Sequence, residues 1–212
     1  MSFIKASIDQ YVTEMSSSVD QILHELEKET YQKVLQPNML SGDYQGQLLQ
    51  LISKIKSPKR ILEIGTYTGY STICLANGLP DGGKIHTLEV NEELKPIQDK
   101  YFNKSGLADI IHQHFGHAAD IIPELNEKFD LVFIDADKKN YLTYFKLVYD
   151  KLQPNSLILS DNILWKGKVA SDSKKDKTAR YLDEYNQYLL AHKHISTLIL
   201  PIRDGISLSV KQ

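Results

Sequence analysis

The sequence predicts a doubly wound α/β fold, with a mostly parallel seven-stranded sheet and a C-terminal antiparallel hairpin. Short apolar runs alternate with amphipathic stretches between residues 60 and 160, and two more runs follow, joined by a Pro-Ile-Arg-Asp-Gly turn. Strands that alternate with helices form a parallel sheet covered on both faces, whereas strands joined by a short turn form a hairpin. The expected strands are Arg60–Ile64, Lys84–Leu88, Ile110–His114, Leu131–Ile134, Leu157–Leu159, Ile195–Leu200 and Ile206–Lys211.

Helical spacing is expected on both sides of this region. Val19, Ile22, Leu23 and Leu26 recur at the spacing of one helix face, and residues 16–18 are serines that could cap this helix. A second helix is expected after residue 174, reaching about Ala191. The first helix would lie outside the α/β core.

Composition bounds the class of protein. Hydrophobic residues make up 42% and charged residues 25%, as in ordinary globular proteins. No apolar run approaches the roughly 20 residues that span a bilayer, and the first residues do not resemble a secretory signal, so we expect a soluble, cytoplasmic protein. The length suits a single domain over residues 1–212, with residues 1–38 as an N-terminal helical appendage.

A glycine-bearing turn follows the first strand, where a cofactor could approach the backbone. It has two glycines, Gly65 and Gly69, whereas a dinucleotide fold uses three to admit a pyrophosphate. Glu63 would repel a pyrophosphate but suits a ligand with an ammonium and a sulfonium group. Glu89 ends the second strand, where such folds place a carboxylate for ribose hydroxyls. The turn alone would also fit an ordinary connection between a strand and a helix, but the position of Glu89 favours a cofactor site.

Oxygen-bearing side chains follow two later strands. Asp135 follows the fourth, and Asp161 and Asn162 follow the fifth. These hard ligands favour Mg²⁺, Mn²⁺ or Ca²⁺ over zinc, with positions left for two vicinal hydroxyl oxygens. Lys138, three residues after Asp135, is the candidate general base. Each segment alone also fits an ordinary turn or helix start; together, at successive strand ends, they favour a catalytic site.

Two segments resemble a known family, the cation-dependent, class I O-methyltransferases that include catechol and caffeoyl-CoA O-methyltransferases. Leu62–Ser71 (LEIGTYTGYS) is similar to the family's first cofactor motif, and Gly116–Pro123 (GHAADIIP) is similar to its adenine-side turn. The similarity runs from about Met39 to Val210. It implies a Rossmann-like methyltransferase fold and S-adenosylmethionine as the methyl donor.

The resemblance also assigns roles to residues. It places Asp135, Asp161 and Asn162 at metal positions and Lys138 at the base position. Trp165 and Asp204 would border the acceptor, and a homodimer is expected. The residues expected at the cofactor are Met39, Ser41, Glu63, Gly65, Tyr67, Ser71, Glu89, Ala118 and Asp135.

The function expected from these features is metal-dependent methylation of one hydroxyl of a small, catechol-like vicinal diol. An alternative with the same chemistry is methylation of 5-hydroxyuridine in tRNA. The net charge of −2 argues against broad nucleic-acid binding, although six Lys and Arg residues lie between Trp165 and Arg180. Further alternatives on the same sheet are a nicotinamide-dependent oxidoreductase and a cofactor-binding protein without catalysis.

Overall fold

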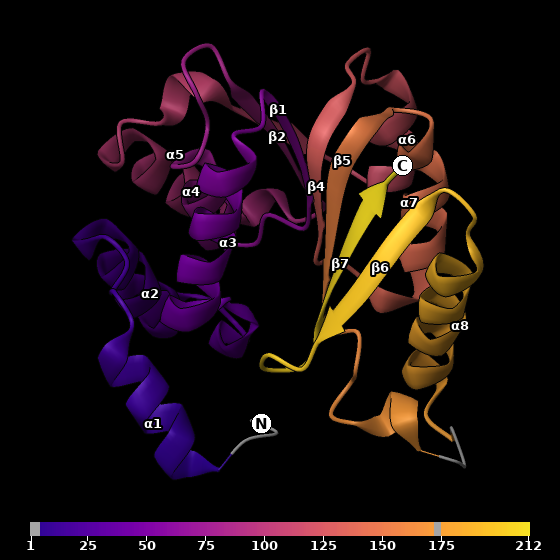
Figure 1. The fold of residues 1–212 in the computed structure, drawn as a ribbon. Coiled ribbons are helices and arrows are strands. Elements are labelled where there is room, and N and C mark those ends of the chain that lie inside the picture. The colour runs from indigo at the N-terminus through magenta and orange to yellow at the C-terminus, as the bar shows by residue number, and fades with distance from the viewer. Residues whose placement is uncertain (1–4, 172–174) are drawn as a thin grey trace.

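The computed structural model describes residues 5–171 and 175–212, and their strands form one seven-stranded sheet (Figure 1). The strand order is β3-β2-β1-β4-β5-β7-β6. Neighbouring pairs among β1 to β5 are parallel, whereas β7 runs antiparallel between β5 and β6. The predicted fold class is confirmed. The strands are β1 (Arg60–Ile64), β2 (Lys84–Glu89), β3 (Ile111–Phe115), β4 (Phe129–Ile134), β5 (Leu152–Asp161), β6 (Ile195–Leu200) and β7 (Ile206–Lys211).

Helices cover both faces of the sheet. In Figure 1, α2 to α5 lie on one side, and α6, α7 and α8 lie on the other. The α-helices are α1 (Ala6–Met15), α2 (Gln21–Lys33), α3 (Gly42–Lys56), α4 (Tyr70–Ala76), α5 (Lys95–Lys104), α6 (Ala118–Glu124), α7 (Tyr141–Tyr149) and α8 (Lys177–Ala191). Short 3-10 helices are η1 (Pro37–Met39), η2 (Glu92–Leu94), η3 (Ala108–Ile110), η4 (Lys138–Asn140) and η5 (Lys168–Ala170). Among the described residues, no helix combines the length and apolarity required for a membrane span.

Two apolar cores lie on opposite faces of the sheet, because alternate residues of each strand point to opposite sides. Leu62 and Ile64 of β1 belong to the core under α6, α7 and α8. Ile61 belongs to the other core, together with Leu23 of α2 and Leu49 of α3. The strand order reverses between β1 and β4, and the ligand crevice of such sheets lies at the carboxyl ends of strands at this switch point.

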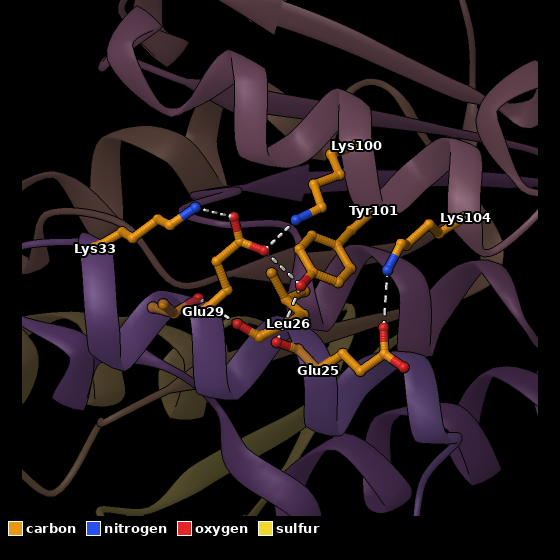
Figure 2. A network of polar contacts seen from close by, with 8 residues as sticks. Glu25, Leu26, Glu29, Lys33, Lys100, Tyr101 and Lys104 are labelled. Atoms are coloured by element: carbon orange, nitrogen blue, oxygen red, sulfur yellow. Dashed lines mark hydrogen bonds and ion pairs between the residues drawn. The ribbon is translucent and has the colours of Figure 1, made fainter.

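The N-terminal helices differ in how they pack. In α1 no residue is buried, whereas Leu23 and Leu26 of α2 are fully buried. Asp20 caps α2, its side chain accepting from the Ile22 N–H, so the expected serine cap was wrong. Figure 2 shows how α2 is joined to α5: Glu29 accepts hydrogen bonds from side chains of both helices. Helix α2 is therefore part of the packed structure.

Candidate active site

The turn after β1 requires its two glycines. Gly65 has φ 106° and Gly69 has φ 90°, backbone conformations that L side chains rarely adopt. A Cβ atom at Gly65 would lie 2.2 Å from the Asp135 carbonyl oxygen, and one at Gly69 would lie 2.5 Å from the Phe102 ring. Glycine at position 65 thus lets the carboxyl ends of β1 and β4 approach each other closely.

Glu63 lies beneath this turn and is fully buried. Its carboxylate accepts hydrogen bonds from the hydroxyls of Ser71 (2.5 Å), Thr72 (2.5 Å) and Thr87 (2.6 Å). Burial raises the pKa of Glu63 to about 7, the three hydroxyl bonds oppose this shift, and the charge of Asp135 adds to it. Glu63 therefore joins the end of β1 to the start of α4 and to β2, on either side of the turn.

Glu89 lies at the end of β2, beside the same turn. One carboxylate oxygen accepts from the Tyr67 N–H at 2.7 Å, and the other accepts from the N–H groups of Val90 (2.9 Å) and Asn91 (3.0 Å). These bonds orient a partly exposed carboxylate next to Tyr67. The Tyr67 hydroxyl donates to the carbonyl oxygens of Leu35 and Gln36, in the segment that leads to Met39.

The remaining expected cofactor residues lie around this crevice. Met39 is 56% exposed at the end of η1, and Ser41 is buried immediately before α3. Ala118 is the buried first residue of α6, which follows β3. Within the part of the chain that the structure describes, no hydrogen bond joins Met39 or Ala118 to the other expected site residues.

Asp135 and Lys138 form an ion pair where β4 ends. The Lys138 ammonium donates to Asp135 Oδ1 at 2.8 Å and to the Tyr141 hydroxyl at 2.7 Å. The Tyr141 hydroxyl in turn donates to the Asp161 carbonyl oxygen at 3.0 Å. Tyr141, which the sequence did not single out, thus links the ends of β4 and β5. The structure brings Asp135, Lys138 and Asp161 together as predicted.

Asp161 is 3% exposed at the end of β5. Its Oδ2 accepts from the Gln45 side-chain amide at 2.8 Å, and its Oδ1 accepts from the Asn162 N–H at 2.7 Å. Burial raises the pKa of Asp161 to about 6, and the neighbouring charge of Asp135 contributes in the same direction. Asn162 has φ 57°, a left-handed conformation that asparagine tolerates better than most residues.

These side chains have the donor chemistry for a hard divalent cation. The charge of Asp135 raises the free energy of the ionised Asp161 carboxylate, and a cation bound between the two side chains would lower it. Asp135 Oδ2 and the Asn162 side chain make no hydrogen bond within the described residues, so both have free lone pairs. The residues present therefore fit a divalent ion.

The loop after Asn162 is held by the β6–β7 turn. The Ile163 N–H donates to the Gly205 carbonyl at 3.1 Å, and the Leu164 N–H donates to the Asp204 carbonyl at 2.9 Å. The Asp204 carboxylate accepts from the Lys166 N–H. Trp165 is partly buried between these contacts and packs against the core under α7 and α8. The structure thus gives Asp204 a clear role in holding the loop that carries Trp165.

Two further residues that sequence analysis missed complete the site. Gln45 is fully buried and bonds Asp161, and Arg203 bonds both Gln45 and the backbone before α3. Arg203 lies in the turn that predicted the hairpin, but the turn sequence did not indicate that its side chain would bond Gln45. Gln45 shares an inward helix face with Leu49, a pattern that would normally indicate only packing.

Comparison with known proteins agrees with this geometry. A family model described as O-methyltransferase matches residues 13–212. A catechol O-methyltransferase of Niastella koreensis is 31% identical and covers 96% of both chains. Caffeoyl-CoA O-methyltransferase 1 of Eucalyptus globulus is 37% identical over 80% of this chain and 74% of its own length.

Solved structures agree as well. An O-methyltransferase from Bacillus cereus, crystallised in complex with SAH (S-adenosylhomocysteine), is 31% identical and superposes with a TM-score of 0.89, covering 97% of both chains. The likeness therefore extends over nearly the whole length of the sequence, including every strand of the sheet. The chain belongs to the O-methyltransferase family.

Proposed function

We propose that this enzyme transfers a methyl group from S-adenosylmethionine to one hydroxyl of a small vicinal-diol aromatic, with a divalent cation as cofactor. The observation that carries the proposal is the buried Asp161 carboxylate beside Asp135, with Asn162 and Lys138 at the same end of the sheet. Membership of the O-methyltransferase family argues against the oxidoreductase alternative, because this family transfers methyl groups.

The cofactor would lie across the ends of β1, β2 and β4. Glu89 would accept hydrogen bonds from the ribose hydroxyls, as carboxylates at this position of such sheets do. Gly65 lets the turn lie directly against the end of β4, and the charges of Glu63 and Asp135 favour the ammonium and sulfonium groups. Met39 and Ser41 would contact the methionine end, and Ala118 would contact the adenine. SAH in the related Bacillus cereus structure supports this choice of donor.

Asp135, Asp161 and Asn162 would hold Mg²⁺, Mn²⁺ or Ca²⁺. Such an ion, when bound, neutralises charge on two vicinal oxygens and makes a coordinated hydroxyl more acidic. Lys138 would act as general base in its neutral form: its amino group would take up the proton of that hydroxyl and become the ammonium, which Tyr141 holds in place. The acceptor oxygen would then form a bond to the methyl carbon as the carbon–sulfur bond breaks, and SAH would leave. Alignment of oxygen, carbon and sulfur is the main contribution of the protein.

The acceptor would lie beside Trp165, in the loop that Asp204 holds. Relatives named for catechol and caffeoyl-CoA support a small aromatic diol. The net charge of −2 argues against the tRNA alternative. In the basic run after Trp165, Lys168 is paired with Asp176 at 2.6 Å, Lys174 lies outside the described residues, and the other four basic side chains are exposed.

Methyl transfer from labelled S-adenosylmethionine to caffeic acid tests the proposal, with Mg²⁺, with EDTA, and with Asp161→Ala. We expect transfer that EDTA abolishes and that Asp161→Ala reduces by at least about 100-fold. Transfer that persists unchanged in EDTA would reject the metal. Tight SAH binding without transfer to any diol would reject the acceptor and direct the search to tRNA containing 5-hydroxyuridine.

A further inference from the structure

We propose that Arg203 and Gln45 act together as a positioning relay for Asp161. The relay would fix the Asp161 carboxylate for the metal and tie it to the backbone on the cofactor side. This inference rests on the proposed function, because it assigns a metal to Asp161. Neither residue would touch the reacting atoms, so both would act through the groups they hold.

Arg203 reaches from the β6–β7 turn to two parts of the chain. Its guanidinium donates to the carbonyl oxygens of Ser41 and Leu40 and, at 2.9 Å, to Gln45 Oε1. Leu40 and Ser41 directly follow Met39, in the segment expected at the methionine end of the cofactor. The fixed fork of the guanidinium allows these contacts to be made together, which a lysine ammonium cannot match in the same geometry.

Gln45 is chemically suited to its place between Arg203 and Asp161. A guanidinium can only donate hydrogen bonds, and an ionised carboxylate can only accept them. An amide does both: Oε1 accepts from Arg203, and Nε2 donates to Asp161 Oδ2 at 2.8 Å. Because Gln45 is fully buried, loss of either bond would leave a polar group without a partner. Arg203 therefore fixes which end of the amide faces Asp161.

The two residues differ in what they hold. Among the described residues, the Gln45 side chain bonds only Asp161 and Arg203, so its loss should affect the metal site alone. Arg203 also holds the backbone of Leu40 and Ser41, so its loss should affect the metal site and the cofactor side together. Hydrogen-bond partners of metal ligands typically contribute about 10- to 100-fold to metal affinity.

Direct binding measurements on the full chain separate these effects. We would measure Mn²⁺ binding by electron paramagnetic resonance, and SAH binding by calorimetry in EDTA, for Arg203→Met, Gln45→Met and the double variant. Arg180→Met is the matched control, because Arg180 is exposed on α8. Both single variants should weaken Mn²⁺ binding by about tenfold or more. Only Arg203→Met should also weaken SAH binding, by at least about threefold, as expected for a lost hydrogen bond.

The double variant tests whether the residues act in series. If Arg203 acts on the metal through Gln45, then Arg203→Met should change Mn²⁺ affinity by less than about twofold once Gln45 is methionine. Full additivity, or single variants that bind Mn²⁺ as tightly as the wild type, would overturn the relay while the proposed function stands. A wild-type protein that binds SAH but no Mn²⁺ would instead overturn the metal site, and the relay with it.

Discussion

At the scale of single residues, loss of the Lys138 side chain should slow methyl transfer without weakening SAH binding. Its ammonium bonds Asp135 and Tyr141 and makes no hydrogen bond to the residues of the glycine-bearing turn within the described part of the chain. General bases typically contribute about 10² to 10⁴ in rate, so Lys138→Met should lower kcat by about 100- to 10,000-fold. The Kd for SAH should stay near that of the wild type.

The neighbouring Lys139 supplies a matched control, because its side chain is 66% exposed. Lys139→Met should retain wild-type kcat. Steady-state kinetics with caffeic acid and calorimetry with SAH check both variants. A Lys138→Met enzyme with unchanged kcat would remove Lys138 from the mechanism.

Gly65 contributes both to the stability of the protein and to the geometry of the candidate site. Gly65→Ala would force a Cβ against the Asp135 carbonyl, and should cost more than the roughly 1–2 kcal/mol of a left-handed alanine alone. Gly82→Ala is the control for backbone strain, because Gly82 has φ 75° and an added Cβ there would meet nothing within 4 Å. Urea unfolding of both variants measures the difference, and equal losses would contradict the close approach of β1 and β4.

Residues with local signals could be predicted from the sequence, whereas residues with distant partners could not. Asp135, Asp161 and Glu89 stand at strand ends, so the strand pattern alone placed them at one edge of the sheet. Gln45 and Arg203 have no such signal: Gln45 bonds a residue 116 positions away, and Arg203 bonds one 158 positions away. Only the folded chain reveals such pairs.

At the scale of elements, the hydrogen bonds between α2 and α5 should make the free energy of unfolding depend on pH. The Glu29 carboxylate bonds Lys100, Tyr101 and Lys33, and these contacts, with Lys100 contributing most, lower the pKa of Glu29 to about 2 (Figure 2). A pKa lowered by folding contributes stability that is complete above the ordinary value near 4.5 and is lost as the pH falls toward 2.

Glu29→Gln should therefore lower the free energy of unfolding at pH 7. The difference in this free energy between the variant and the wild type should shrink as the pH falls from 4.5 toward 2. Glu25→Gln is the control, because the Glu25 side chain is 45% exposed and its carboxylate pairs with Lys104 at the surface. Its effect should be smaller, as exposed ion pairs contribute little. Urea unfolding across this pH range measures both, and a Glu29→Gln effect independent of pH would contradict the assignment.

Element boundaries followed the sequence where its pattern was regular. The bounds of β1, β6 and β7 were predicted correctly, but β5 extends over Leu152–Asp161 rather than Leu157–Leu159. Pro154 and Asn155 are residues typical of a turn, so the sequence did not predict a strand there. The register of the β4–β5 pair shifts between Phe129 and Leu131, and this irregularity accommodates both residues within β5. Helix α1 lies within the helical appendage expected over residues 1–38, but it was not predicted as a separate element, although Ile8, Tyr11 and Met15 recur at helical spacing.

At the scale of the whole molecule, α1 is the element best placed to form the homodimer that the sequence resemblance implies. Ile8, Tyr11 and Met15 lie on one helix face and are 49%, 64% and 66% exposed. Exposed apolar faces of this kind often mark protein contacts. Deleting residues 1–15 should leave the thermal unfolding of the domain cooperative but convert the dimer to a monomer. Light scattering after size exclusion checks the mass, and an unchanged dimer would place the interface elsewhere.

The position of β7 has a consequence for the order in which this protein can mature during synthesis. Because β7 lies between β5 and β6, the strand that ends in Asp161 keeps one edge unpaired until residues 206–211 have been made. An open strand edge is a site of unwanted pairing with other chains. We therefore expect a stage of synthesis in which the edge of β5 can pair with other chains and the proposed metal ligand Asp161 lacks the support of β7. A chaperone that shields β5 should raise the yield of active enzyme.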